Sequence, residues 1–112
     1  MRVSTENAEH YLWGENCDGW RLLQRDDLRI LQERVPAGAA EVWHYHERAR
    51  QFFYVLDGEE VMAFDDHEIA LHKGQGVEIE PMTRHQFKNS SNVDVHFLVI
   101  SAPSTGGDRV NV

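Results

Sequence analysis

The chain has 112 residues, of which 41% are apolar, and 19 acidic against 11 basic side chains leave a formal net charge of −8. This length suits one domain, and the acidic balance argues against nucleic acid or an anionic membrane as a partner, because no basic patch would release counterions from phosphate. The single cysteine, Cys17, excludes an internal disulfide, and neither a secretory signal nor a ~20-residue apolar span is present, so we expect a cytoplasmic protein.

The chain is predicted to form a single domain over residues 1–112 with two loosely organised ends. Residues 1–20 are polar with scattered aromatic side chains, and we expect an N-terminal arm that lies on the surface of the domain. A barrel is predicted over residues 21–102. The Gly-rich end, residues 103–112, is expected to be a loose tail.

Between these ends the sequence breaks into short runs typical of β-strands. The runs are rich in β-branched or aromatic residues or alternate apolar with polar positions, and Gly, Pro or Asp turn signals separate most of them; they are 28–35, 51–56, 60–64, 68–71, 77–80 and 93–101. No segment keeps the 3.6-residue period of an amphipathic helix. Short strands at this spacing predict an all-β domain, either an antiparallel sandwich or a barrel.

Four polar residues are candidate metal ligands. His44 and His46 are separated by one residue, and on a strand this spacing turns both imidazoles to the same face, where they can chelate one ion. If Gln51 points inward on the next strand, its amide oxygen adds a third ligand, and His85 can complete the set from across the barrel. These residues predict one divalent metal ion without identifying it, since imidazole binds zinc, nickel, manganese, iron and copper.

The spacing around these residues resembles the two sequence motifs of the cupin family. Segment 38–58, GAAEVWHYHERARQFFYVLDG, is similar to the first motif, G-x5-H-x-H-x4-E-x6-G, with Gln51 in the place of the glutamate. Segment 74–89, GQGVEIEPMTRHQFKN, is similar to the second motif, G-x5-P-x-G-x2-H-x3-N. Here Glu80 and Met82 stand where proline and glycine are usual.

This resemblance implies a double-stranded β-helix barrel, an RmlC-like jelly roll, with the metal in its mouth. It assigns the ligands to the three histidines and the glutamine named above. It also implies that Asn89 is structural and that three motif glycines serve turns, namely Gly38, Gly58 and Gly74.

The glutamine in the ligand set bears on the chemistry. Three neutral imidazoles and a neutral amide leave the charge of the ion uncompensated, which predicts a strong Lewis acid that attracts an anionic or enolate-forming ligand. We therefore expect an enzyme that acts on a small oxygen-rich metabolite, such as a sugar acid or keto acid, by isomerisation, ring opening or lyase chemistry. The alternative for Gln51 is that it binds no metal and hydrogen-bonds His44 or His46.

The same ligand pattern resembles small cupins that linearise unsaturated uronates during pectin and alginate breakdown. His96, Tyr45 and Arg34 are the candidates for a group that moves a proton near the metal. Two other functions stay open, because cupins carry many chemistries. One is a non-catalytic module that binds a small metabolite, and the other is a dioxygenase that uses iron or copper.

The run 51–56 predicts contact with a second copy of the chain. Phe53 and Val55 share one face of this strand, while Phe52, Tyr54 and Leu56 occupy the other. A strand that is apolar on both faces is buried on both faces. In a barrel this small, the outer face must then be covered, either by a second copy of the chain or by the aromatic N-terminal arm, and we expect a homodimer.

Overall fold

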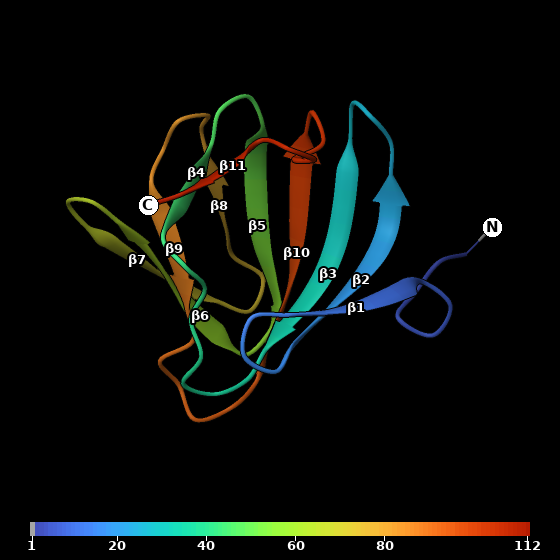
Figure 1. Cartoon of the computed structure of the whole chain (residues 1–112). Coiled ribbons are helices and arrows are strands. Elements are labelled where there is room, and N and C mark those ends of the chain that lie inside the picture. Colours follow the sequence, from blue (N-terminus) through green and yellow to red (C-terminus); the bar gives the residue numbers. More distant parts are fainter. Residues whose placement is uncertain (1) are drawn as a thin grey trace.

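The computed structural model describes residues 2–112, and all of the helix or strand structure assigned within them consists of β-strands (Figure 1). The strands are β1 (Glu9–Trp13), β2 (Cys17–Gln24), β3 (Arg29–Val35), β4 (His44–His46), β5 (Arg50–Asp57), β6 (Glu59–Phe64), β7 (Glu68–His72), β8 (Gly76–Ile79), β9 (His85–Lys88), β10 (Val95–Ala102) and β11 (Arg109–Asn111). The predicted all-β class is confirmed, and each predicted run coincides with a strand to within two residues. Across the described residues, no helix is long and apolar enough to cross a membrane.

The strands form two antiparallel sheets with the core between them. One sheet has six strands in the order β1-β2-β3-β10-β5-β8, and the other has five in the order β11-β4-β9-β6-β7. Figure 1 shows β1 and β7 on opposite sides of the molecule, with strands of both sheets between them. Strands far apart in sequence are therefore neighbours: β10, near the C-terminus, lies between β3 and β5.

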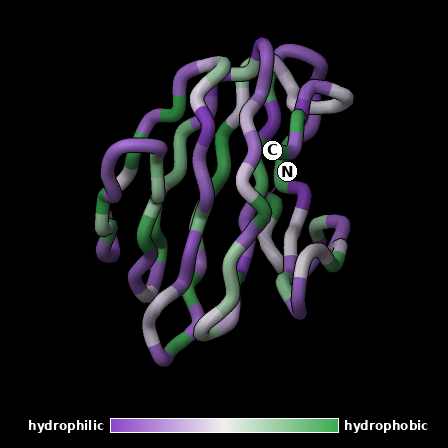
Figure 2. Tube along the Cα trace, turned by 60° about the vertical axis from the view of Figure 1, so that its left-hand side comes forward, coloured by the Kyte–Doolittle hydropathy of each residue, from purple (hydrophilic) through white to green (hydrophobic). Residues whose placement is uncertain are grey.

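Alternation along the strands builds the core. In β10 every second side chain is buried, and the tube coloured by hydropathy shows apolar and polar positions alternating along several strands (Figure 2). Phe53, Phe87 and Phe97 meet between the sheets, with ring centroids 4.3 to 6.2 Å apart. Each buried aromatic ring stabilises the fold by about 2–3 kcal/mol relative to exposure. These rings also support the site, because the Phe53 ring lies 6.3 Å from that of His85.

The turn between β5 and β6 requires a glycine. Gly58 has a φ of 85°, in the left-handed region that residues with a Cβ rarely adopt. A Cβ at this position would lie 2.5 Å from the Asp94 carbonyl oxygen, so the available space also excludes a larger residue. Gly38 and Gly74 have positive φ as well, as expected from their positions in turns.

Asn89 has the structural role that was expected. Its Nδ2 donates to the carbonyl oxygens of Val35 and Val93 at 3.0 and 2.8 Å, and its Oδ1 accepts from the backbone and hydroxyl of Ser91. The side chain is almost fully buried. It therefore ties the end of β3 to the loop between β9 and β10.

The N-terminal residues do not form a separate arm. Residues 9–13 and 17–24 form the hairpin β1–β2, and β2 pairs with β3 from Asp18 onward. The expected boundary at residue 20 therefore falls inside a strand of the large sheet. The aromatic side chains of Tyr11 and Trp13 pack against the core, which gives this polar segment the apolar contacts that hold it in place.

A loose tail was expected over 103–112, but strand pairing and hydrogen bonds hold this segment against the barrel. β11 pairs with β4 along Arg109–Asn111. Just before it, the buried carboxylate of Asp108 accepts hydrogen bonds from the backbone N–H groups of Arg48 and Ala49 at 3.1 and 2.9 Å. Such charge-assisted bonds are stronger than neutral ones, and they hold the Gly-rich segment against the β4–β5 loop.

Candidate metal centre

Three of the predicted ligands lie together on one buried face of the five-stranded sheet. His44 and His85 are cross-strand partners on β4 and β9, and His46 lies two residues further along β4 on the same face. The ring centroids are 4.4 Å apart for His44 and His85, 5.1 Å for His44 and His46, and 6.2 Å for His46 and His85. The i, i+2 spacing of His44 and His46 thus places both rings on the same face of β4, as strand geometry predicts.

Backbone hydrogen bonds orient two of the three rings. Nδ1 of His44 lies 2.8 Å from the Val42 carbonyl oxygen, and Nδ1 of His85 lies 2.8 Å from that of Thr83. A carbonyl oxygen can only accept, so each Nδ1 carries the proton and each Nε2 is free to bind a metal. Nε2 of His85 and Nδ1 of His46 are buried without a hydrogen-bond partner among the described residues. Buried polar atoms normally have a partner, so these nitrogens fit a site for a cation.

Gln51 lines the same cavity from β5, in the other sheet. Its Nε2 donates to Ser101 Oγ at 3.1 Å, while its Oε1 is buried without a partner in the part of the chain described. The amide therefore offers the cavity an oxygen, which is the end that a cation requires. Within residues 2–112, Gln51 makes no hydrogen bond to His44 or His46.

The sequence did not point to Glu41, a carboxyl group beside the histidines. Glu41, His44 and His85 each place one ligand-type atom within 4.8 Å of the others. Oε1 of Glu41 is 3.9 Å from Nδ1 of His44, the nitrogen already bonded to Val42. The carboxyl thus lies beside the protonated side of that ring, and burial raises its pKa to about 8. At neutral pH this carboxyl is therefore mostly protonated, and a cation bound beside it would favour its ionised form.

The environment keeps all three imidazoles neutral. Burial, followed by the proximity of His85, lowers the pKa of His44 to about 3 and that of His46 to about 4. Burial also lowers the pKa of His85. Neutral imidazole is the form that binds metal ions, so the three rings can bind a metal at pH 7 without first losing a proton.

A cavity of about 250 Å³ opens beside the histidines, and its walls come from both sheets. Three of the predicted ligands line it, namely His44, His46 and Gln51, and the other polar side chains in its walls are Tyr11, Arg21, Arg29, Glu33, Glu41, Thr105 and Arg109. Sequence reasoning singled out none of them. A signal was present on β3, because Arg29 and Glu33 have the same strand parity as the buried Leu31 and Val35.

Tyr11, Gly19 and Glu33 form one row across β1, β2 and β3. Because Gly19 has no side chain, the Tyr11 ring lies over it, in space that a Cβ on Gly19 would occupy. The Tyr11 hydroxyl therefore reaches Glu33 and donates to its Oε2 at 2.5 Å. Burial raises the pKa of Glu33 to about 7, and burial together with Glu33 keeps the pKa of Tyr11 above its usual value. A carboxyl that titrates near neutral pH thus faces the cavity.

The three predicted proton-transfer candidates lie elsewhere. Tyr45 lies between His44 and His46 on β4, so strand alternation turns it to the opposite face. Arg34 and His96 are cross-strand partners on β3 and β10, on the outer face of the large sheet. None of the three is among the described residues that line the cavity.

Comparison with known proteins places these features in a family context. A family model described as "Cupin domain" matches residues 31–101. The chain is 32% identical over 74 residues to the uncharacterized protein MJ1618 of Methanocaldococcus jannaschii, a match that covers 66% of this chain and 59% of that one. It is 29% identical over 92 residues to quercetin 2,3-dioxygenase of Bacillus subtilis, with 70% of this chain and 27% of the other covered. The matches thus span less than two thirds of these curated relatives.

Solved structures share the fold over nearly the whole chain. The structure of KdgF from Halomonas sp. has a TM-score of 0.84 at 17% identity, covering 93% of this chain and 95% of that one. The polyketide cyclase RemF from Streptomyces resistomycificus has a TM-score of 0.86 at 18% identity, covering 100% and 84%. At these identities the likeness concerns the fold alone.

Proposed function

The chain belongs to the cupin family, with its RmlC-like double-stranded β-helix fold, and from this premise we propose that it is a metal-dependent enzyme acting on a small oxygen-rich metabolite. Sugar acids and keto acids are the substrate classes that we favour, and isomerisation, ring opening or lyase chemistry the reaction types. The observation that carries the proposal is that His46 and Gln51, each with an unpartnered ligand atom, line one cavity together with the titratable carboxyl of Glu33. One molecule bound in this cavity would then contact both the metal ion and the carboxyl that transfers a proton.

The proposed metal ligands are His44, His46, Gln51 and His85. The unpartnered nitrogens and the Gln51 amide oxygen support this set, because a cation would supply the partner that each lacks. A divalent ion bound there supplies Lewis-acid polarisation of a carbonyl or hydroxyl oxygen. Glu41, beside His44, is proposed to balance part of the positive charge rather than to bind directly.

Glu33 is proposed as the group that moves a proton to or from the bound molecule. A carboxyl with a pKa of about 7 serves as acid or base with similar ease at neutral pH. The Tyr11 hydroxyl donates to Oε2 of Glu33, which orients the carboxyl. Proton transfer of this kind is what isomerisation and ring opening require, and neither reaction consumes an oxidant.

Elemental analysis of protein purified without an affinity tag tests the metal site. We expect one divalent ion per chain in the wild type, and loss of the ion in His46→Ala. His67→Ala is the matched control, because His67 is exposed in the turn before β7 and should leave the metal content unchanged. One ion per chain retained in His46→Ala would show that the ligand assignment is wrong.

The same preparation separates the competing functions. Similarity to quercetin 2,3-dioxygenase is the observation that favours an oxygenase. Bound iron or copper, with substrate loss that stops when oxygen is removed, would support that function instead. Bound zinc or nickel, with oxygen-independent turnover of a sugar acid or keto acid, would support the proposed isomerisation, ring-opening or lyase function. Tight binding of such an acid without any turnover would support a binding module.

A further inference from the structure

We propose that Arg29 binds a carboxylate of the small molecule that occupies the cavity, so that the site selects a compact acid held between Arg29 and the metal ligands. This inference rests on the proposed function, since it takes the histidine cluster as the other anchor of the same molecule. It adds a specificity-determining residue and excludes neutral sugars as preferred ligands.

The partners of Arg29 distinguish it from the other arginines. The side chain lies on β3, lines the cavity, and its Nη2 donates to Thr105 Oγ1. Its Nε is buried without a partner among the described residues. Within residues 2–112, no carboxylate oxygen lies within 4.0 Å of the Arg29 guanidinium, whereas six other arginines have such a partner: Arg21, Arg34, Arg48, Arg50, Arg84 and Arg109.

A cation in this environment is costly unless an anion accompanies it. Burial lowers the pKa of the Arg29 guanidinium, and Tyr11 and Glu33 act on it only from beyond hydrogen-bonding distance. A buried charge without a partner destabilises a fold. A ligand carboxylate would supply the missing charge, and the planar guanidinium fork matches a carboxylate with two parallel hydrogen bonds.

The other two arginines that line the cavity are already engaged within the protein. The Arg21 guanidinium lies 4.3 Å from the centroid of the Tyr11 ring, and Arg109 Nη1 lies 3.9 Å from Glu41. Both add positive potential to the walls of the cavity. Among the described residues, Arg29 is the one of the three with no carboxylate oxygen within 4.0 Å of its guanidinium, since Glu33 acts on it only from farther away, and for this reason we assign the ligand carboxylate to it.

Strand register sets the distance between the two anchors. Arg29 pairs with Ser101, and Ser101 pairs with Gln51, so these residues form one row across β3, β10 and β5. Adjacent strands lie ~4.8 Å apart, which places the Arg29 and Gln51 backbones roughly 10 Å apart with both side chains on the inner face. The cavity volume of about 250 Å³ is at the small end for ligand pockets. An acid no larger than a monosaccharide fits this span.

Binding of matched acid and neutral probes tests the proposal. The pairs are D-galacturonate with D-galactose, and pyruvate with methyl pyruvate, measured by calorimetry on metal-loaded and metal-stripped protein. We expect the wild type to bind at least one acid more tightly than its neutral counterpart by about tenfold or more. Arg29→Gln should lose this preference, and Arg29→Lys should keep part of it because the charge remains without the fork.

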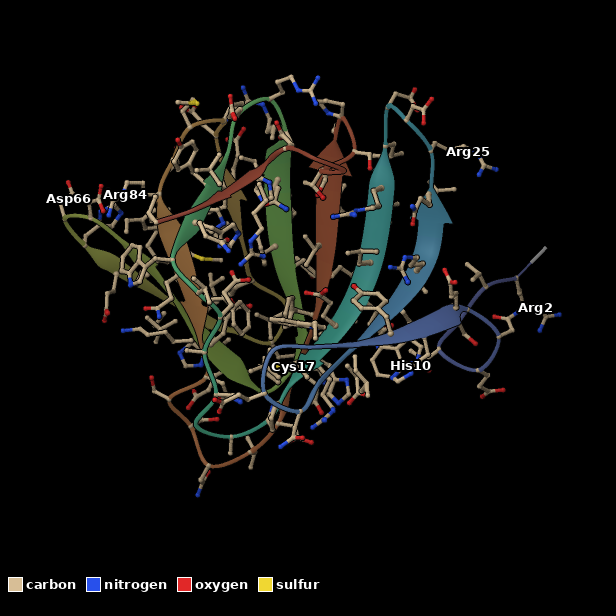
Figure 3. The ribbon with its side chains drawn as sticks, viewed as in Figure 1. Arg2, His10, Cys17, Arg25, Asp66 and Arg84 are labelled. Carbon is tan, nitrogen blue, oxygen red and sulfur yellow. The ribbon has the colours of Figure 1, made fainter. Side chains whose placement is uncertain are left out.

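Arg25→Gln is the control variant. Arg25 is exposed, lies between β2 and β3, and points away from the barrel (Figure 3), so its replacement should leave the acid preference unchanged. Thermal unfolding of the ligand-free variants gives a second measurement. Because Arg29→Gln removes a partly buried charge that has no ion-pair partner, the variant should unfold at the same temperature as the wild type or higher.

Two results would overturn the carboxylate assignment: an acid preference retained in Arg29→Gln, or no acid preference in the wild type. Neither result would remove the proposed metal site, because metal content is measured separately and Arg29 is not among its ligands. Conversely, loss of acid preference in Arg29→Gln with no metal in the wild type would leave the anion site and refute the metal-dependent function.

Discussion

Met82 stands where the second cupin motif usually has glycine, and its backbone conformation explains that preference. Its φ is 68°, in the left-handed region, and its N–H donates to the His46 carbonyl oxygen at 2.7 Å. The side chain is 60% exposed and gains little from packing. The chain therefore keeps an unfavourable backbone conformation next to a proposed metal ligand.

Replacing Met82 by glycine should stabilise the protein. A non-glycine residue in this region costs about 1–2 kcal/mol, and glycine loses about 0.5–1 kcal/mol more entropy on folding than alanine, so Met82→Gly should gain roughly 0.5–1 kcal/mol. Urea unfolding measures the difference. Met82→Ala keeps a Cβ and should show no such gain. A lower midpoint for Met82→Gly would mean that the Met82 side chain contributes more than its exposure indicates.

Glu33 should make stability depend on pH in a defined window. Its pKa rises from 4.5 to about 7 in the folded state, because burial favours the neutral acid. Between these values the folded state binds more protons than the unfolded state, so this contribution is complete below pH 4.5 and is lost as pH rises to 7. The unfolding temperature of Glu33→Gln relative to wild type should therefore increase from pH 4.5 to 7 and then level off. A pH-independent difference would contradict burial of an ionisable Glu33.

At the scale of strands, the sequence predicted the histidine set well because motif spacing and strand parity act together over a few residues. Tyr45 could have been discarded on parity alone, since it lies between two residues assigned to the inner face. Parity with Leu31 and Val35 also turns Arg29 to the inner face, but it does not bring Arg29 or Tyr11 to the same cavity as the histidines. Their position in the cavity depends on which strands pair and in what register, and long-range pairing leaves no local pattern in the sequence.

The contacts of Asp108 near the C-terminus are also long-range and could not be predicted from the local sequence, whose Gly-rich composition suggested a loose segment. Asp108→Asn should weaken the hold on β11, because an amide loses the charge and one of the two acceptor oxygens that receive backbone N–H bonds. We expect a loss of about 1.5–3 kcal/mol in unfolding free energy and faster hydrogen exchange in residues 109–111. Asp94→Asn, at an exposed carboxylate, is the control. Unchanged protection of β11 in Asp108→Asn would refute the anchoring role.

At the scale of the whole molecule, the outer face of the six-stranded sheet is the candidate for self-association. Phe52 is 40% exposed and lies opposite Ile100, and both line a shallow apolar groove. Its ring stacks at 6.4 Å on that of Tyr54. We propose that a second copy of the chain covers this face, as the two-sided apolar pattern of residues 51–56 predicted.

Light scattering coupled to size exclusion tests this proposal. The wild type should have twice the chain mass of 13.0 kDa, and Phe52→Glu should shift toward a single chain because a carboxylate would be buried in the interface. Leu12→Glu is the control, since Leu12 is exposed on β1 away from this groove. A dimer that persists in Phe52→Glu would locate the contact elsewhere.

The walls of the cavity have a consequence for how such a protein diversifies. Tyr11, Arg21, Arg29 and Glu33 come from the first three strands, whereas the histidines come from β4 and β9. These cavity-lining side chains, which include the proposed proton-transfer group Glu33, are thus encoded in a different stretch of the gene from the histidines. A transplanted β1–β3 segment could present a new set of side chains to an unaltered histidine cluster, so that substrate preference would change by exchange of one contiguous piece of chain.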